Sequence, residues 1–200
     1  MKKNFKLFVI TALLMISNFT IAQIYPTAND VKPLLIGQKI PNATLQNLDG
    51  KDVELESLMA EQPSVVVFYR GGWCPYCNAQ LAGLAKIENE IKDLGYQIIA
   101  ISPENFQNIP EVAKKDKVSY TLLSDNGGNL IQRTGIAFEM PDNYKKGLSS
   151  KVKGNLTPIL PVASVFIVNR SGEIMFEYIN PDYKIRLPKD MLLAVLKSLK

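Results

Sequence analysis

The sequence of 200 residues contains no histidine, only two cysteines and a single tryptophan. The absence of histidine excludes mechanisms that need an imidazole base, so a carboxylate, a thiol, a lysine or water must move any proton. Two cysteines cannot build a disulfide framework, and without histidine they cannot complete the four ligands of a structural zinc site. We therefore expect neither a metal nor a bound cofactor.

Clusters of positive charge are missing from most of the chain. The full sequence has a formal net charge of +4. Once the three lysines of residues 1–22 are set aside, 20 basic residues face 19 acidic ones, and no tract rich in lysine or arginine remains. This near-neutral balance gives no support for a nucleic-acid partner.

The amino terminus has the layout of a secretory signal peptide over residues 1–22. Three lysines precede the apolar stretch from Leu7 to Ile16, and the small residues Thr20 and Ala22 predict cleavage after Ala22. An uncleaved anchor is the alternative, but a spanning helix needs about 20 apolar residues and this stretch is much shorter. We expect an exported protein, periplasmic or extracellular, with no stable membrane insertion after cleavage.

The most informative motif is Trp73-Cys74-Pro75-Tyr76-Cys77, which directly follows the apolar run from Val65 to Tyr69. Two intervening residues place both thiols on one helical turn if a helix begins at Cys74, and Pro75 suits a first turn because it lacks an N–H. The positive end of a helix favours a thiolate, which is the attacking form in disulfide exchange and in peroxide reduction. The alternatives are a static disulfide, which would close too short a loop to stabilise much, and a zinc site.

The hydrophobic pattern of the remaining chain predicts alternating strands and helices. Strands are expected at 64–69, 96–102 and 120–125, with helices at 57–62, at 79–94 and from about 105 to 116. Hairpins are expected around Asp49-Gly50 and between strands 162–168 and 173–178, and a last helix at 189–197. This order predicts an α/β thioredoxin-like fold with a central mixed sheet flanked by helices.

The mature chain is expected to form one thioredoxin-like domain over residues 37–200, preceded by a loose leader at residues 23–36. Residues 135–161 show weak periodicity and contain several lysines, glycines and prolines. We interpret them as an irregular insertion, either a plain surface loop or a lid for a substrate or partner.

The segment from Phe68 to Cys77 resembles the peroxiredoxin-like branch of the thioredoxin superfamily, which is related to alkyl hydroperoxide reductases and thiol-specific antioxidants. The segments 37–41, 47–51 and 166–172 support the resemblance, which spans about residues 35 to 197. It implies a thioredoxin-like fold and peroxide reduction by a thiol.

Several positions depart from the patterns that the resemblance implies. Peroxiredoxins place a proline seven and a threonine three residues before the peroxidatic cysteine, and with Cys77 in that place these positions hold Arg70 and Cys74. Thioredoxins use the first cysteine as the nucleophile and place a cis-proline at the start of a late strand. Pro161 is the candidate for that proline, while Ala163 stands where we expect the proline or the peroxide-binding arginine.

The sequence thus predicts an exported thiol oxidoreductase with a redox-active pair, Cys74 and Cys77. Its substrate is a peroxide or, in the alternative of thiol-disulfide exchange, a disulfide, and an external thiol reductant such as a thioredoxin-like protein reopens the bridge. A non-catalytic domain with a structural disulfide is the third alternative. Trp73 is either an aromatic wall beside the sulfurs or a packing residue, and Arg70 either lowers a thiol pKa or is solvated.

Overall fold

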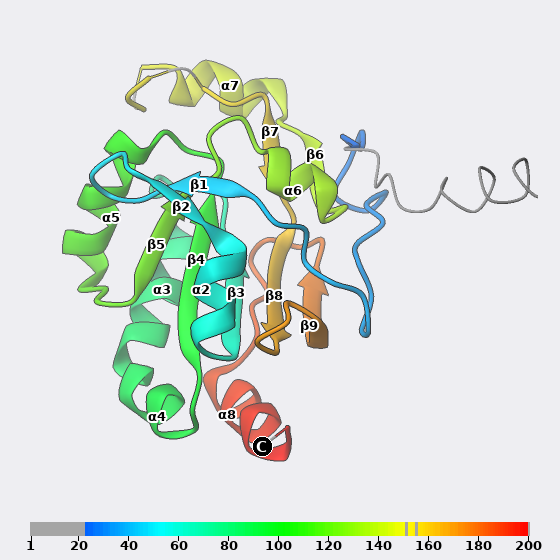
Figure 1. Cartoon of the computed structure of the whole chain (residues 1–200). Helices are drawn as coiled ribbons and strands as arrows, with labels where there is room; N and C mark the ends of the chain where they lie inside the picture. Colours follow the sequence, from blue (N-terminus) through cyan, green and yellow to red (C-terminus); the bar gives the residue numbers. More distant parts are fainter. Residues whose placement is uncertain (1–22, 151, 155, 200) are drawn as a thin grey trace, which may run out of the picture.

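The computed structural model describes residues 23–150, 152–154 and 156–199. Seven strands form one sheet in the order β2-β1-β5-β4-β3-β8-β9 (Figure 1). These strands are β1 (Thr44–Gln46), β2 (Asp52–Glu54), β3 (Ser64–Phe68), β4 (Gln97–Ser102), β5 (Thr121–Ser124), β8 (Ala163–Val168) and β9 (Ile174–Asn180). The helices are α2 (Leu55–Glu61), α3 (Pro75–Lys86), α4 (Glu88–Asp93), the 3-10 turn η1 (Phe106–Asn108), α5 (Ile109–Asp116), α6 (Asn129–Arg133), α7 (Asp142–Leu148) and α8 (Lys189–Ser198).

Strand β3 lies beside β4 in the middle of the sheet and carries the chain to the cysteines. It pairs in parallel with β4 and antiparallel with β8, and β4 pairs in parallel with β5. All five residues of β3 are buried because helices cover both faces of the sheet. The mixed sheet flanked by helices confirms the predicted α/β thioredoxin-like fold.

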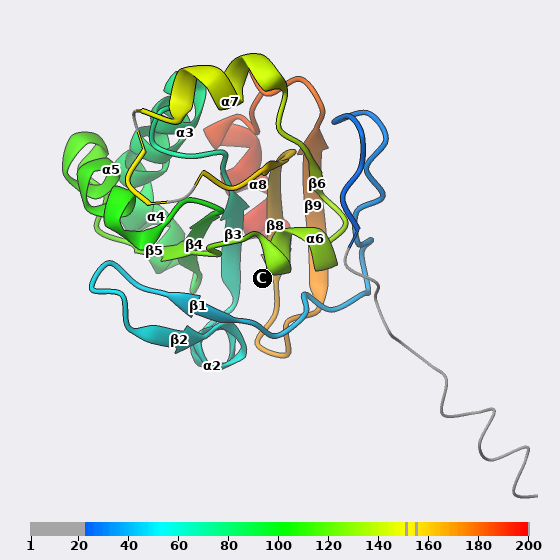
Figure 2. The same cartoon turned by 90° about the horizontal axis from the view of Figure 1, so that it is seen from above.

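Two hydrophobic layers fix the position of the helices. Side chains alternate along β3, so Val65 and Val67 face one layer while Val66 and Phe68 face the other. The first layer receives α3, α4, α5 and α8, and the second receives α2 and α6; Figure 2 shows α3 and α8 on one side of the sheet and α2 on the other. The helix that bears the cysteines is therefore packed against the middle of the sheet.

Most predicted elements are confirmed, but the helix expected at 79–94 is interrupted. Helix α3 ends at Lys86 and α4 begins at Glu88, because Ile87 leaves helical geometry with φ −112° and ψ 12°. The two hairpins form as predicted, and both turns contain a glycine with φ +76°, Gly50 and Gly172. Such a positive φ is readily adopted only by glycine.

The insertion at 135–161 contains more regular structure than the sequence predicted. Strands β6 (Ala137–Glu139) and β7 (Ile159–Pro161) pair antiparallel, and α7 lies between them, so the prediction of an irregular segment is wrong for these stretches. The weak periodicity has a physical cause: three-residue strands and a seven-residue helix are too short to show a repeating pattern.

The leader at residues 23–36 forms no helix and no extended strand, yet it is held at both ends. Tyr25 is buried and its N–H donates to Ala137 of β6, and the N–H of Leu34 donates to Thr134 after α6. The predicted signal peptide, residues 1–22, lies outside the described residues. Among the residues that the structure does describe, no helix combines the length and apolar character needed to cross a membrane.

Candidate functional site

The two cysteines lie at the amino end of α3, directly after the central strand. Cys74 is the N-cap residue and Pro75 is the first helical residue, as the motif predicts. The N–H of Cys74 donates to Gly71 O at 3.1 Å, and the N–H of Asn78 donates to Cys74 O at 3.1 Å, which fixes the first turn. Cys74 and Cys77 are 1% and 0% exposed, so both sulfurs lie beneath the surface.

The surroundings push the acidities of the two thiols in opposite directions. The pKa of Cys74 is lowered to about 6 because the Cys77 thiol donates to its sulfur, because the Cys77 N–H points to it, and because Arg70 and Arg186 are close, effects that outweigh its burial. Burial, followed by the hydrogen bond and the charge of Cys74, raises the pKa of Cys77. The site therefore holds its negative charge on Cys74 and its proton on Cys77.

Arg70 occupies a cluster of aromatic rings beside the cysteines. It is 3% exposed, and its guanidinium carbon lies 4.9 Å from the ring centre of Trp73, 4.6 Å from that of Tyr144 and 4.4 Å from that of Tyr183. Its Nε has no hydrogen-bond partner, and no carboxylate of the described residues forms an ion pair with it. Since a buried cation without a carboxylate keeps its full field, Arg70 can stabilise a nearby thiolate.

Trp73 packs between two groups of hydrophobic side chains, as the packing interpretation expects. Its ring packs against the main core and also against a small cluster of the insertion, where it contacts Tyr144 at 5.6 Å between ring centres. Tyr76 and Tyr183 meet edge to face at 5.5 Å. Rings from the motif, from α7 and from the segment after β9 thus gather around Arg70 beside the motif.

Arg186 is a site residue that the sequence did not reveal. One terminal nitrogen lies 3.5 Å from the Sγ of Cys77 and the other lies 3.3 Å from Oε1 of Gln80, so the guanidinium is held against α3. Arg186 belongs to the segment that joins β9 to α8. Nothing in the local sequence signals that this segment returns to the cysteines.

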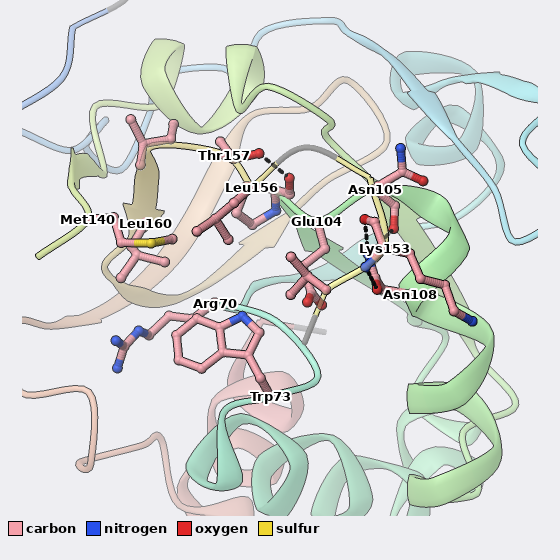
Figure 3. A pocket seen from close by; sticks show the side chains of 13 residues that line it. Arg70, Trp73, Glu104, Asn105, Asn108, Met140, Lys153, Leu156, Thr157 and Leu160 are labelled. Carbon is pink, nitrogen blue, oxygen red and sulfur yellow. Dashed lines mark hydrogen bonds between the residues drawn. The ribbon is translucent and has the colours of Figure 1, made fainter. Parts of the chain in front are cut away.

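Glu104 is a second residue that the sequence did not reveal. Its Oε2 accepts a hydrogen bond from the N–H of Gly72 at 2.7 Å, and burial raises its pKa to about 7. Glycine is required before the cysteines, because a Cβ on Gly71 would lie 2.6 Å from the carboxyl carbon of Glu104 and the φ of Gly71 is +144°. Figure 3 shows the carboxyl group beside the indole of Trp73, at the wall of a narrow cavity between the motif and the insertion.

Pro161 lies at the end of β7, where it pairs with Ala137. Together with Ala163 it lines a cavity of about 150 Å³ that Arg70, Tyr144 and Tyr183 also line. The structure therefore brings four of the predicted residues, Arg70, Trp73, Cys74 and Cys77, together at one site, and Pro161 lines a cavity with Arg70. No cis peptide bond occurs in the described residues.

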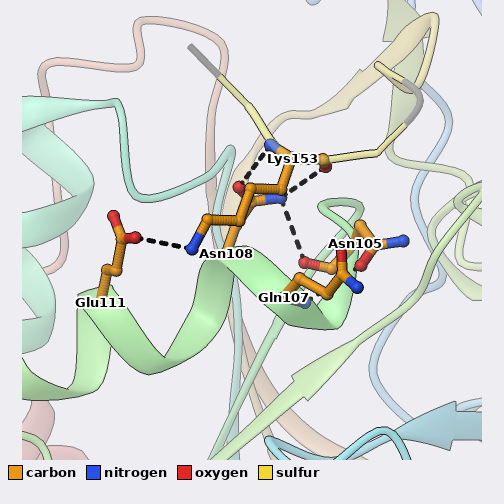
Figure 4. Close-up of polar contacts among 5 residues, drawn as sticks. All are labelled: Asn105, Gln107, Asn108, Glu111 and Lys153. Carbon is orange, nitrogen blue, oxygen red and sulfur yellow. Dashed lines mark hydrogen bonds and ion pairs between the residues drawn. The ribbon is translucent and has the colours of Figure 1, made fainter.

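The insertion is attached to η1 and α5 by polar contacts of Lys153 (Figure 4). The side chain of Asn108 donates to Lys153 O at 3.0 Å and accepts from Lys153 N at 2.8 Å, as a backbone peptide group would in a sheet. Lys153 Nζ also reaches Glu111 at 2.8 Å. The end of the insertion that follows α7 is therefore fixed to the body of the domain.

A pair of cysteines at the amino end of a helix, next to the central strand of a thioredoxin-like sheet, defines a thiol oxidoreductase. The model of the AhpC/TSA family matches residues 36–176, and the chain therefore belongs to this family. The resemblance to the peroxiredoxin-like branch is thereby confirmed.

The chain is similar to curated peroxiredoxins over most of its length. It is 28% identical to the putative peroxiredoxin bcp of Haemophilus influenzae over 169 residues, covering 84% of this chain and 100% of that protein. It is 26% identical to peroxiredoxin Bcp of Escherichia coli K12 over 168 residues, covering 84% and 99%.

Solved structures show the same fold. Peroxidoxin BcpB of Mycobacterium tuberculosis superimposes with a TM-score of 0.64 at 18% identity, over 82% of this chain and 97% of that one. Reduced Prx3 of Vibrio vulnificus in complex with H₂O₂ gives a TM-score of 0.70 at 16% identity, over 82% and 99%. At such low identity these likenesses establish the fold alone.

Proposed function

We propose that this protein is an exported thiol peroxidase in which the Cys74 thiolate attacks the peroxide and Cys77 resolves the product. The observation that carries the proposal is the opposite acidity of the two thiols: Cys74 is ionised near neutral pH, while Cys77 keeps its proton. Only the thiolate is a good nucleophile, so Cys74 is the reactive sulfur.

The proposed cycle needs only the two cysteines and an external reductant. The Cys74 sulfur forms a bond to the outer peroxide oxygen while the O–O bond breaks, and the departing oxygen takes up a proton and leaves as an alcohol or water. The Cys77 thiol then attacks the Cys74 sulfenic acid, releasing water and forming the Cys74-Cys77 disulfide. A thiol reductant such as a thioredoxin-like protein returns two electrons by disulfide exchange.

The family pattern and the electrostatics of the site disagree about the attacking cysteine. By position in the peroxiredoxin motif, Cys77 is the peroxidatic residue and Cys74 takes the place of the threonine. Cys77 is however fully buried, and burial raises its pKa. We favour Cys74 because a protonated, buried thiol is a poor nucleophile, whereas Arg70 and Arg186 both stabilise charge on Cys74.

Stopped-flow oxidation of the reduced mature protein by hydrogen peroxide, followed by Trp73 fluorescence, tests the proposal. Cys77→Ser should keep the fast first step and accumulate a sulfenic acid that dimedone traps. Cys74→Ser should lose the fast step. The reverse assignment, in which only Cys77→Ser loses the fast step, would contradict Cys74 as the attacking sulfur.

Thiol-disulfide exchange is the second candidate function. It is favoured by one observation: the first cysteine of the pair caps the helix with a low pKa, the arrangement that attacks a disulfide equally well. Slow oxidation by peroxide alongside rapid reduction of insulin disulfides through Cys74 would select this function over the peroxidase.

Export rests on the amino-terminal sequence alone. Cell fractionation combined with the mass of the recovered chain tests it, and a mature protein that begins at Gln23 in the periplasm or the medium is the expected result. An intact chain that starts at Met1 and stays in the cytoplasmic fraction would contradict it.

A further inference from the structure

Glu104 stands out among the buried carboxylates of the described residues because it alone is bonded to the loop that carries the cysteines. Glu88 pairs with Lys92, and Asp125 accepts from the backbone N–H groups that open α6. Asp116, at the end of α5, is buried with no hydrogen bond from the described residues to its Oδ2. Glu104 instead accepts from Gly72, two residues before Cys74. The proposed peroxidase cycle gives it no role so far.

The proposed reaction requires a proton donor, and the sequence offers few. When the thiolate attacks a hydroperoxide, the departing alkoxide or hydroxide is strongly basic and must be protonated as the O–O bond breaks. No histidine exists in the chain. The proton of Cys77 is held in the hydrogen bond to Cys74 and is needed for the second step. A carboxylic acid close to the motif is a suitable donor, because its pKa can lie near neutral pH when it is buried.

We propose that Glu104 donates the proton to the leaving oxygen of the peroxide, through a water molecule in the narrow cavity that it shares with Arg70 and Trp73. This cavity, of about 10 Å³, has room for a single water. The proposal rests on the peroxidase function argued above and assigns a proton path to it. In this step Cys74 Sγ gains the outer oxygen, the O–O bond breaks, and Glu104 passes from acid to carboxylate as the alcohol leaves.

The acidity of Glu104 suits this task. Burial and, to a smaller extent, the charge of Cys74 raise its pKa to about 7, against the hydrogen bond from Gly72. The pKa of Cys74 is lowered to about 6, so between these values the thiolate and the carboxylic acid are present together. This is the combination that the proposed step consumes.

A second cavity connects Glu104 to the surface and provides its route for recovering a proton. This cavity, of about 280 Å³, is lined by Glu104 and Trp73 and by polar side chains of α5 that reach solvent. The titratable and charged groups that face Glu104 come from β3 and its end, from the motif, from α5 and from the insertion: Tyr69, Arg70, Cys74, Glu111, Lys115 and Lys153. Of these only Cys74 and Glu104 titrate near neutral pH with a resolved shift.

The variant Glu104→Gln tests the proposal, because a glutamine can still accept from Gly72 but cannot donate a proton in this way. At about pH 6.5 we expect Glu104→Gln to react about 100-fold more slowly with ethyl hydroperoxide, a magnitude usual for general acid catalysis. With peracetic acid, whose leaving group is a stable carboxylate that needs no proton, the rate should stay within about threefold of wild type. Glu56→Gln, on the exposed face of α2 on the other side of the sheet, is the control and should match wild type with both oxidants.

The choice of oxidant separates proton donation from a structural role. If Glu104→Gln slows both oxidants equally, or slows neither, the proposal is overturned. The pH profile of the wild type is a second test that needs no variant: the rate with ethyl hydroperoxide should fall above about pH 7, while the rate with peracetic acid should not fall there. If the wild type reacts with both oxidants no faster than free cysteine, the peroxidase function itself fails and this inference falls with it.

Discussion

Two regions of the molecule have different tasks in building the site. One is the strand-turn-helix segment from Ser64 to Lys86, and the other consists of the two segments that enclose it, the insertion at 137–161 and the tail at 181–187. The first segment supplies both sulfurs from a single helical turn and buries every residue of β3 in the core. The second pair supplies Tyr144, Tyr183 and Arg186, which contact the motif or its arginine. The comparison shows that the core fixes the position of the thiols, while the surrounding segments adjust their charge and access.

The largest expected effect is a loss of stability when the core beneath the cysteine segment is altered. Phe68→Ala removes a fully buried ring that packs against Phe166 at 5.9 Å between ring centres. We expect a loss of about 3–5 kcal/mol in the free energy of unfolding, from lost burial and the cavity left behind. Urea unfolding measures it. An effect below about 1 kcal/mol would show that β3 is not the rigid base of the site.

The next effect should change the charge of the site and leave its stability almost unaltered. Arg186→Met removes a cation beside the cysteines, so the pKa of Cys74, now lowered to about 6, should rise. Since only the thiolate alkylates, the pH at which iodoacetamide reactivity rises should shift upward by about one unit. Arg170→Met, at the exposed turn between β8 and β9, is the control and should leave the profile unchanged. An unchanged profile for Arg186→Met would remove the tail from the site.

A smaller effect should appear in access to the sulfurs. Tyr144→Ala removes a ring that contacts both Arg70 and Trp73, and such contacts contribute about 1 kcal/mol. We expect alkylation of the cysteines in the reduced protein at fixed pH to become about fivefold faster, because a loss of about 1 kcal/mol corresponds to a rate change of about that size. Tyr144→Phe keeps the ring and should behave like wild type. Equal rates for the alanine and phenylalanine variants would mean that α7 does not limit access.

The smallest effect is expected at the exposed anchor of the insertion. Lys153→Met breaks the ion pair with Glu111. The side chain of Lys153 is 57% exposed and that of Glu111 is 75% exposed. Exposed pairs of this kind contribute at most about 1 kcal/mol, so thermal unfolding should shift only slightly. Asn108→Ala, which removes two hydrogen bonds to the same residue, should cost more than the ion pair. The opposite order would show that charge rather than hydrogen bonding holds the insertion.

The sequence predicted those parts of the molecule whose signals are local. Buried strands, hairpin turns and the CxxC helix follow from spacing and turn residues, and the positions of Cys74 and Pro75 in α3 are confirmed. Hydrophobic spacing did not predict the interruption at Ile87, because it indicates only which face of a helix is buried. Leu84, Ile87 and Ile91 are all buried, so the spacing continues through the break.

The groups that surround the thiols could not be predicted in the same way. Glu104 is bonded to Gly72, which lies 32 residues away in the sequence. Arg186 is bonded to Cys77, which lies 109 residues away. Such contacts depend on how separate elements pack, and nothing in the residues next to each of them encodes the partner. The two glycines before Trp73 were the one sequence signal of a close neighbour, because they leave space for a side chain. The sequence alone does not tell which residue supplies that side chain.

The placement of both sulfurs on one turn of α3 also bears on the chemical endurance of the protein. A sulfenic acid that waits for a distant partner is exposed to a second peroxide, which converts it irreversibly to a sulfinic acid. Here the resolving thiol lies on the first turn of the helix that Cys74 caps, so the two sulfurs start close together. In the proposed cycle the vulnerable intermediate is therefore short-lived, and the protein should survive peroxide concentrations that inactivate thiol enzymes with remote resolving cysteines.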